Sequence, residues 1–308
     1  MYEINTIADF EKLPQNLRDE VLKAIRAKDK LDEFLKSQNK KQDKSPEETP
    51  ETWIDCPKCT PGGKPGLYLK KGKEKRDNSD IHPSQIDKCI KNLYYSCAGY
   101  ADQLEEHIDP RVRRIFDLGH AWHNIMQNWY GKGGAWCAPE HYHDEVRIDP
   151  DAKTFDGKPA LPIAEYYWIK GSVDAIITRC ELQVPGLGDV AIRLVHEYKT
   201  MKSTEYDKLT RPKPEHKKQA TIYSAVFDIP VVVYLYLNKD NSQMADFPVA
   251  FDHTIWQWIV EKCEKVKHYV NTETLPPWEE TSASKNPREC MDCGYRKICQ
   301  PPLKQLGR

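Results

Sequence analysis

Hydrophobic positions recur at helical spacing in some parts of the chain and form alternating or continuous runs in others. Near the N-terminus, Leu17, Val21, Leu22 and Ile25 are spaced as on one face of a helix, so residues 1–36 are expected to be helical. Further helices are expected at 112–130, 215–227 and 253–270, and strands at 141–148, 166–180, 189–200 and 231–238. This order predicts an α/β fold with a mixed β-sheet flanked by helices.

Polar segments divide the chain of 308 residues into four parts. The N-terminal helical segment, 1–36, is followed by a polar, Pro-containing linker at 37–52. A small basic segment with a Cys-x2-Cys motif occupies 53–80, and 81–308 are expected to form one larger domain.

The charge is nearly balanced, at a formal net value of −1, so the whole chain exerts no strong attraction on an acidic partner. Basic residues nevertheless cluster at 64–76 and again after residue 199. The candidate DNA-binding residues of the second cluster are Lys202, Lys208, Arg211, Lys213, Lys217 and Lys218. No apolar run reaches the roughly 20 residues of a membrane span, and 1–13 lack the pattern of a signal peptide. We therefore expect a cytoplasmic protein, in which the ten cysteines indicate metal ligation more than disulfides.

Charged side chains interrupt two of the expected apolar strands. Asp174 lies inside one strand, and Glu197 and Lys199 lie two residues apart on the next, so the latter two project from the same face. A buried carboxylate without a partner is costly. A divalent cation between Asp174 and Glu197, with Lys199 beside it, would explain all three, because Mg²⁺ and Mn²⁺ prefer carboxylate oxygens.

Each of these residues also has an ordinary structural interpretation. Glu197 and Lys199 can form a simple ion pair, which contributes little at a surface. Asp174 can cap a turn, and His123 can be a core histidine with satisfied hydrogen bonds. Gln219 and Tyr223, four residues apart on one helix face, can be surface residues.

The ordered set of these positions resembles the PD-(D/E)xK nuclease family, in its RecB-type branch. The matching motifs, in chain order, are Gly119-x-x-x-His123, Gly171-x-x-Asp174, Glu197-Tyr198-Lys199 and Gln219-x-x-x-Tyr223. Val173 stands before Asp174 in place of the proline of the motif name.

The resemblance implies a restriction-endonuclease-like core and a role for each matching residue. His123, Asp174 and Glu197 would ligate Mg²⁺ or Mn²⁺ together with the backbone carbonyl of Tyr198. Lys199 would activate or position the attacking water. Two further catalytic residues, Gln219 and Tyr223, would hold the scissile phosphate or the DNA strand. His120 does not match a ligand position and is expected to support the site or the fold.

Three cysteines near the C-terminus, Cys290, Cys293 and Cys299, have a spacing that can surround one metal centre but leaves a fourth position open. Cys89, just before the core, is the candidate for that position. This arrangement resembles the iron–sulphur nucleases of the RecB branch, including the AddB nuclease domain and CRISPR-associated exonucleases. The resemblance implies a [4Fe–4S] cluster that staples the segments before and after the core. Structural Zn²⁺ on the same four thiols is the alternative.

A separate pair, Cys56 and Cys59, looks like half of a zinc site. The candidates to complete such a site are Cys97, Cys137, His82, His141 and His143. Two free thiols are the alternative. Cys180 and Cys263 lie among apolar residues and are expected in the core.

From these residues and the resemblance we expect a metal-dependent DNA exonuclease that hydrolyses phosphodiester bonds at single- or double-stranded DNA ends. Family members act in recombination, repair and phage DNA processing, so recombination or replication proteins are expected partners in a bacterial or phage context. A non-catalytic DNA-end binding module and a restriction-like endonuclease are the two alternatives.

Overall fold

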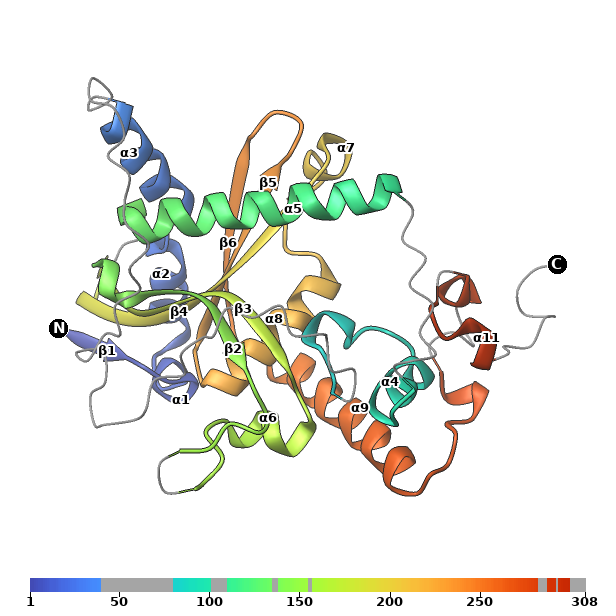
Figure 1. Cartoon of the computed structure of the whole chain (residues 1–308). Coiled ribbons are helices and arrows are strands. Elements are labelled where there is room, and N and C mark those ends of the chain that lie inside the picture. The colour runs from blue at the N-terminus through green and yellow to red at the C-terminus, as the bar shows by residue number, and fades with distance from the viewer. Residues whose placement is uncertain are drawn as a thin grey trace.

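The computed structural model describes residues 1–39, 80–100, 110–134, 138–154, 157–281, 287–291 and 293–299. A mixed six-stranded sheet flanked by helices forms its centre, which confirms the expected α/β class (Figure 1). The strands are β1 (Tyr2–Ile4), β2 (Tyr142–Ile148), β3 (Gly171–Val184), β4 (Gly188–Met201), β5 (Val231–Asn238) and β6 (Met244–Ala250). Among the longer helices are α2 (Gln15–Ala24), α3 (Ala27–Asn39), α4 (Ile90–Cys97), α5 (Pro110–Trp129), α8 (Pro214–Phe227) and α9 (His253–Asn271). Shorter helices are α1 (Ile7–Glu11), α6 (Pro162–Tyr167), α7 (Ser203–Tyr206) and α11 (Arg296–Cys299).

Strand β4 is the hub of the sheet. The strand order is β2-β3-β4-β5-β6, and β4 pairs antiparallel with β3 and parallel with β5. The parallel neighbour requires a crossover connection, which α7 and α8 provide. The first half of β4 also pairs in parallel with β1, from Val190 to Ile192.

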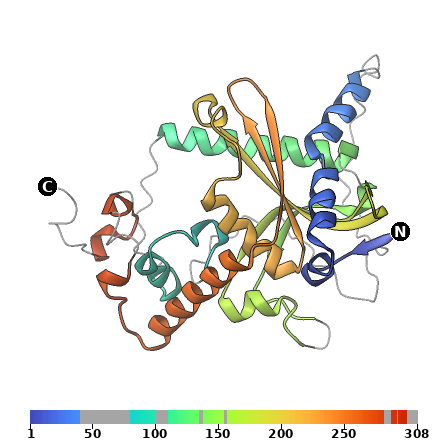
Figure 2. The same ribbon diagram turned by 180° about the vertical axis from the view of Figure 1, so that it is seen from behind.

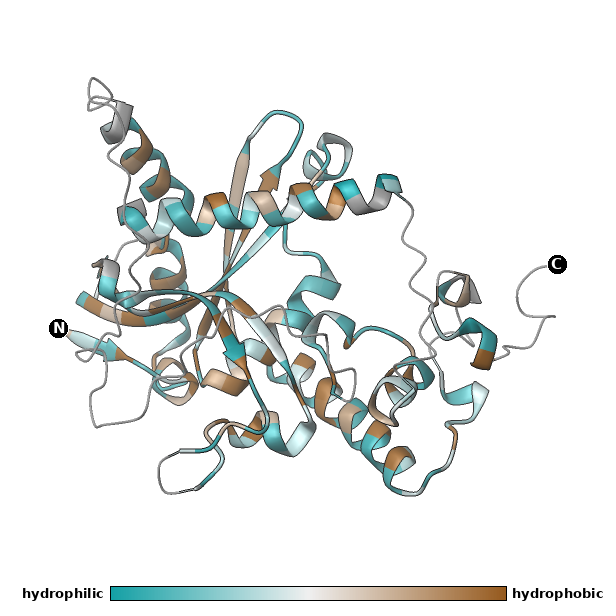
Figure 3. Cartoon of the chain, in the orientation of Figure 1, coloured by the Kyte–Doolittle hydropathy of each residue, from teal (hydrophilic) through white to brown (hydrophobic). Residues whose placement is uncertain are grey.

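Each face of the sheet is buried by a different set of helices. Alternation along β5 shows this directly, because Val232 and Tyr234 belong to one hydrophobic core while Val233 and Leu235 belong to the other. The first core packs against α4, α6, α8 and α9, and the second against α1, α2, α3 and the end of α5. Figure 2 shows the same two layers from behind, and Figure 3 shows hydrophobic residues concentrated on the strands between them.

Two expected elements differ from the structure, and strand β6 has no expected counterpart. The N-terminal segment is not entirely helical, because Tyr2–Ile4 form a strand whose partners lie in β4. The strand expected from 166 begins only at Gly171, since residues 162–167 form α6, and Trp168 ends that helix in a left-handed conformation (φ 55°). Strand β6 was not expected; it contains Pro248, which fits its position at the edge of the sheet.

Candidate active site

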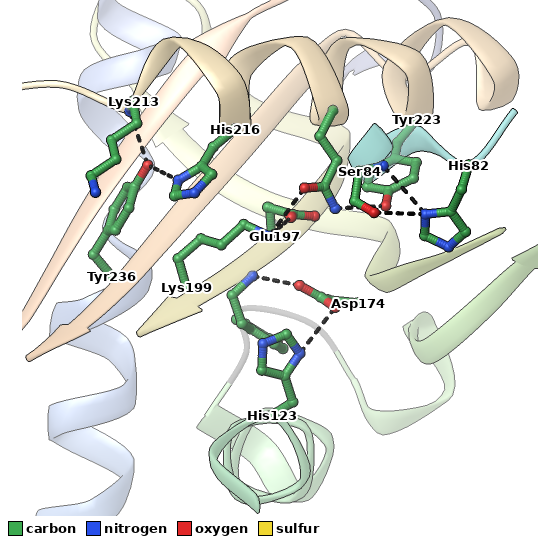
Figure 4. Close-up of polar contacts among 12 residues, drawn as sticks. His82, Ser84, His123, Asp174, Glu197, Lys199, Lys213, His216, Tyr223 and Tyr236 are labelled. Carbon is green, nitrogen blue, oxygen red and sulfur yellow. Dashed lines mark hydrogen bonds and ion pairs between the residues drawn. The ribbon is translucent and has the colours of Figure 1, made fainter. Parts of the chain in front are cut away.

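The predicted site residues meet where β3, β4, α5 and α8 approach one another (Figure 4). His123 on α5 points at Asp174 on β3, and Lys199 on β4 contacts Gln219 on α8. Four elements that are distant in sequence therefore supply one constellation.

Asp174 is held in place from three directions. Its Oδ2 accepts a hydrogen bond from the backbone N–H of Tyr198 at 2.7 Å, and its Oδ1 lies 3.1 Å from Nδ1 of His123. Its backbone carbonyl accepts a hydrogen bond from Nε2 of the buried Gln127 at 3.1 Å. A side chain fixed in this way keeps its orientation when a ligand binds, which is what a catalytic constellation requires.

His123 and Asp174 shift each other's protonation. Burial lowers the pKa of His123, but the hydrogen bond and the charge of Asp174 outweigh it, so the pKa is raised overall. Burial raises the pKa of Asp174, but the hydrogen bond from His123 and the nearby positive charges outweigh it, so the carboxyl remains ionised more readily than usual. Because a carboxylate only accepts, Nδ1 of His123 carries a proton, and in the neutral imidazole Nε2 keeps its lone pair.

Glu197 is the most buried ionisable group of the site. It is 0% exposed, and burial raises the pKa of its carboxyl to about 7. Nζ of Lys199 lies 2.5 Å from its Oε1, yet neither carboxylate oxygen has a partner in a well-formed hydrogen bond among the described residues. A buried carboxylate with unused acceptor capacity is costly unless something else binds there.

Lys199 links the carboxylates to α8. Its ammonium pairs with Glu197 and donates to Oε1 of Gln219 at 3.2 Å, while Nε2 of Gln219 donates to the hydroxyl of Tyr223 at 2.9 Å. Burial lowers the pKa of Lys199, but Glu197 and Asp174 outweigh it and keep the ammonium charged. The site therefore presents a cation and polar side chains beside the carboxylates, an arrangement suited to an anionic substrate.

Gly171 has a packing role in this site. A Cβ at this position would lie 2.9 Å from Cδ of Pro83 and 3.3 Å from Nε2 of His82. Only glycine allows the 3₁₀ turn at Pro83–Gln85 to approach β3 so closely. The other motif glycine, Gly119, has nothing within 4 Å of the position that a Cβ would take, and His120 beside it is exposed.

Gln127 and the contact between His216 and Tyr236 lie near the site and were not expected from the sequence. Gln127 lies four residues after His123 on the same face of α5, so helical spacing alone would have indicated it. His216 lies three residues before Gln219 on α8, and its Nδ1 is 2.8 Å from the hydroxyl of Tyr236 on β5. The second pairing joins distant elements and leaves no signal in the sequence.

The candidate DNA-binding residues follow β4 into α8, and most have acidic neighbours. Lys202 and Lys213 pair with Glu205, Lys217 pairs with Asp252, and Lys218 pairs with Asp87. Lys208 and Arg211 are exposed and have no ion pair with any described part of the chain. For these last two, no carboxylate of the described residues competes with a phosphate backbone.

Cys89, Cys290, Cys293 and Cys299 line one pocket of about 470 Å³. Burial, followed by the neighbouring thiols, raises the pKa of Cys290 to about 11, and burial also raises the pKa values of Cys89 and Cys299. The structure thus brings together four cysteines from the two ends of the domain. Cys180 and Cys263 are fully buried in the hydrophobic cores, as expected.

Both candidate metal sites have suitable donors without forming a closed cage. Within the described ranges, no group of three or more His, Cys, Asp or Glu side chains is arranged so that it could hold a metal ion. The donor types still fit, because carboxylates and imidazole suit Mg²⁺ or Mn²⁺ and four thiols suit iron–sulphur or zinc. The unsatisfied oxygens of Glu197 are the structural feature that a cation would explain.

Of the residues considered for a separate zinc site, Cys56, Cys59 and Cys137 lie outside the described residues. His141 has its Nδ1 3.2 Å from Oγ1 of Thr178.

None of the helices in the described ranges combines the length and the apolar character that a membrane crossing needs.

The sequence matches no protein-family model and no curated protein. Among solved structures, a protein named SSO0001 is similar with a TM-score of 0.40 and 18% identity, over 73% of this chain and 87% of that chain. An alkaline exonuclease from Laribacter hongkongensis, LHK-Exo, is similar with a TM-score of 0.40 and 14% identity, over 64% of this chain and 90% of that chain. Its complex with dAMP gives a TM-score of 0.41 at the same identity and coverage. These values mark a distant similarity, and the chemistry of the site is therefore inferred from its own residues.

Proposed function

We propose that the protein is a metal-dependent DNA exonuclease that hydrolyses phosphodiester bonds at DNA ends. The observation that carries this proposal is the buried Glu197 carboxylate, whose oxygens are unsatisfied. Glu197 lies beside Lys199 on β4, which pairs with β3, the strand that carries Asp174. In an ordinary buried ion pair, both the carboxylate and the ammonium have their hydrogen bonds satisfied. A substrate or metal site instead keeps carboxylate oxygens free to accept a ligand.

In this proposal His123, Asp174, Glu197 and the carbonyl of Tyr198 would hold Mg²⁺ or Mn²⁺. Such cations are commonly held by one or two carboxylates together with water and substrate phosphates, so a complete protein cage is not required. When bound, the cation supplies Lewis-acid stabilisation of the phosphate charge and a water of lowered pKa.

The remaining residues of the site position the substrate. Lys199 donates one ammonium proton to Gln219 and pairs with Glu197 by charge, and it would direct a remaining proton to the attacking water or to a phosphate oxygen. Gln219 and Tyr223 hold one another on α8 and would contact the DNA strand at the scissile phosphate. Lys208 and Arg211, with the paired cations Lys202, Lys213, Lys217 and Lys218, would bind the phosphates that follow.

We further propose that Cys89, Cys290, Cys293 and Cys299 hold a [4Fe–4S] cluster, with structural Zn²⁺ as the alternative occupant. Their shared pocket supports this proposal. The cluster would connect α4, before the catalytic residues, to the C-terminal segment, after them. Because its ligands would tie α4 to the C-terminal segment, the role assigned to the cluster is structural.

The test is a nuclease assay on linear single-stranded and duplex DNA with Mn²⁺, Mg²⁺ or EDTA. Wild-type protein should shorten linear DNA only when metal is present, and Lys199→Ala should be inactive. Lys36→Ala is the matched control, because Lys36 is an exposed residue near the end of α3, on the opposite side of the sheet from α8. Linear DNA that is bound but left intact would favour the DNA-end binding module, and cleavage of closed circular DNA would favour the endonuclease.

A further inference from the structure

His216 lies on the face of α8 that borders the proposed active site. It is three residues before Gln219 and seven before Tyr223, so helical periodicity places all three on one side of α8. Figure 4 shows its ring between Tyr236 and the Glu197 side chain. The residue as a whole is half-buried.

Tyr236 fixes one side of this ring. Its side chain is 0% exposed, and its hydroxyl oxygen accepts a hydrogen bond from the backbone N–H of Lys213 at 3.1 Å. The same hydroxyl lies 2.8 Å from Nδ1 of His216. Tyr236 also pairs with Lys199 in the β4–β5 register, so this contact adjoins the strand that carries the catalytic motif.

The direction of the Tyr236–His216 hydrogen bond follows from the donor count. A tyrosine hydroxyl has one proton, and a buried hydroxyl proton without an acceptor is costly. Since the backbone N–H of Lys213 already donates to the oxygen, the hydroxyl proton is free to be donated to Nδ1 of His216. A neutral imidazole that accepts at Nδ1 carries its own proton on Nε2.

The surrounding charges favour the neutral ring. Burial, followed by the positive charges of Lys199 and Lys213, lowers the pKa of His216 to about 3, against the opposing charge of Glu205. The imidazole is therefore an uncharged donor at neutral pH. Such a donor can bind a phosphate oxygen without adding a positive charge beside Lys199 and the carboxylates.

We propose that His216, held in its Nε2–H form by Tyr236, donates a hydrogen bond to a phosphodiester of the bound DNA strand. This inference rests on the proposed nuclease function and adds a substrate-binding residue to it. The alternative is that His216 serves only as the buried partner of the Tyr236 hydroxyl.

Two substitutions separate these roles. His216→Asn keeps an acceptor near Nδ1 for Tyr236 and removes the donor at Nε2, whereas His216→Gln keeps a donor near Nε2 and removes the contact at Nδ1. We would measure binding of a fluorescein-labelled single-stranded oligothymidylate by anisotropy, with Ca²⁺ in place of Mn²⁺, and kcat and KM with Mn²⁺. Nitrogen chemical shifts of the ¹⁵N-labelled histidines would identify the tautomer of His216.

In the wild-type protein we expect His216 to carry its proton on Nε2. His216→Asn should bind DNA about tenfold more weakly, with a raised KM, because a hydrogen bond to a charged group is lost. His216→Gln should bind and cleave nearly as well as the wild type. The inference would be overturned if Nδ1 of His216 carried the proton in the wild type. It would also be overturned if DNA binding weakened more in His216→Gln than in His216→Asn, weakened equally in both variants, or weakened in neither. If the wild type binds DNA but cleaves none with any metal, the proposed nuclease function fails, while the binding and tautomer measurements still decide the role of His216.

Discussion

Glu197 and Lys199 project from the same face of β4 with Oε1 and Nζ 2.5 Å apart, yet this contact does not bring the Glu197 carboxyl back to ordinary acidity. Burial raises its pKa to about 7 despite the adjacent ammonium. In this protein the strand carries a carboxylate that is protonated and deprotonated near neutral pH, at the position where the proposed function places a metal ligand.

Metal binding should therefore depend on pH. Below pH 7 a proton on Glu197 competes with the cation, so Mn²⁺ affinity should fall as pH drops from 8 to 6, by up to about tenfold per pH unit below the pKa. Binding only to the folded state stabilises it, by about 2.7 kcal/mol at a metal concentration 100 times Kd. Thermal unfolding with and without Mn²⁺ should show a larger shift at pH 8 than at pH 6.

Glu197→Gln should remove that metal-dependent stabilisation at both pH values. Glu205→Gln, on the exposed α7, is the control and should retain it. A stabilisation by Mn²⁺ that persists in Glu197→Gln would show that the cation binds elsewhere.

The coupling between His123 and Asp174 gives a second expectation. Burial alone would lower the pKa of His123, and the Asp174 hydrogen bond and charge reverse that effect. Asp174→Asn removes the charge, so the pKa of His123 should fall below its ordinary value. An NMR titration of the histidine ring protons would measure this change, with His143 as an internal reference that should keep its lowered pKa. An unchanged His123 pKa would mean that Asp174 does not control its protonation.

Local patterns in the sequence were sufficient to predict the elements that carry the site. The spacing of Glu197 and Lys199 along β4 and of Gln219 and Tyr223 along α8 is a property of each element alone, and the structure retains it. Strand β1 was missed because its three residues become a strand only by pairing with β4, nearly two hundred positions away. Strand β6 was missed because its sequence includes Pro248, which only an edge position accommodates.

The same distinction applies within the site. Gln127 could have been found from its spacing to His123, whereas the contact between His216 and Tyr236 depends on how α8 packs against β5. Hydrogen bonds across separate elements are set by tertiary packing, so no spacing in the chain encodes them.

Acid should destabilise the protein through His196. This residue is 0% exposed, its Nε2 has no hydrogen-bond partner in the described part of the chain, and burial lowers its pKa to about 3. Between the unfolded-state pKa of about 6.5 and the folded-state value, the unfolded chain binds one more proton, so stability falls as pH falls, by about 1.4 kcal/mol per pH unit. His196→Phe should remove this contribution in urea unfolding series at pH 5 and pH 7, whereas the exposed His120→Asn should not. Equal acid sensitivity of His196→Phe and the wild type would contradict this assignment.

The four-cysteine pocket predicts a defined metal content. Protein purified without oxygen should contain about four iron atoms and about four sulfides per chain. Cys299→Ser should lose the iron and sulfide and should unfold at a lower temperature. Cys180→Ala should keep the iron, because Cys180 lies in the hydrophobic core on the α2 and α3 side of the sheet. Zinc bound to the wild type and absent from Cys299→Ser would identify the alternative occupant. Wild-type protein with neither metal would rule out both.

The two motif glycines should respond differently to the same substitution. At Gly171 an added Cβ would lie 2.9 Å from Cδ of Pro83, so Gly171→Ala must displace the Pro83–Gln85 turn or β3. Overpacking of this kind costs about 1–3 kcal/mol. Gly119→Ala meets no atom within 4 Å on α5, and alanine is favoured over glycine in a helix by about 1 kcal/mol, so stability should be unchanged or improved. Urea unfolding of both variants beside the wild type measures the difference, and a Gly171→Ala protein as stable as Gly119→Ala would show that the turn does not rest on β3.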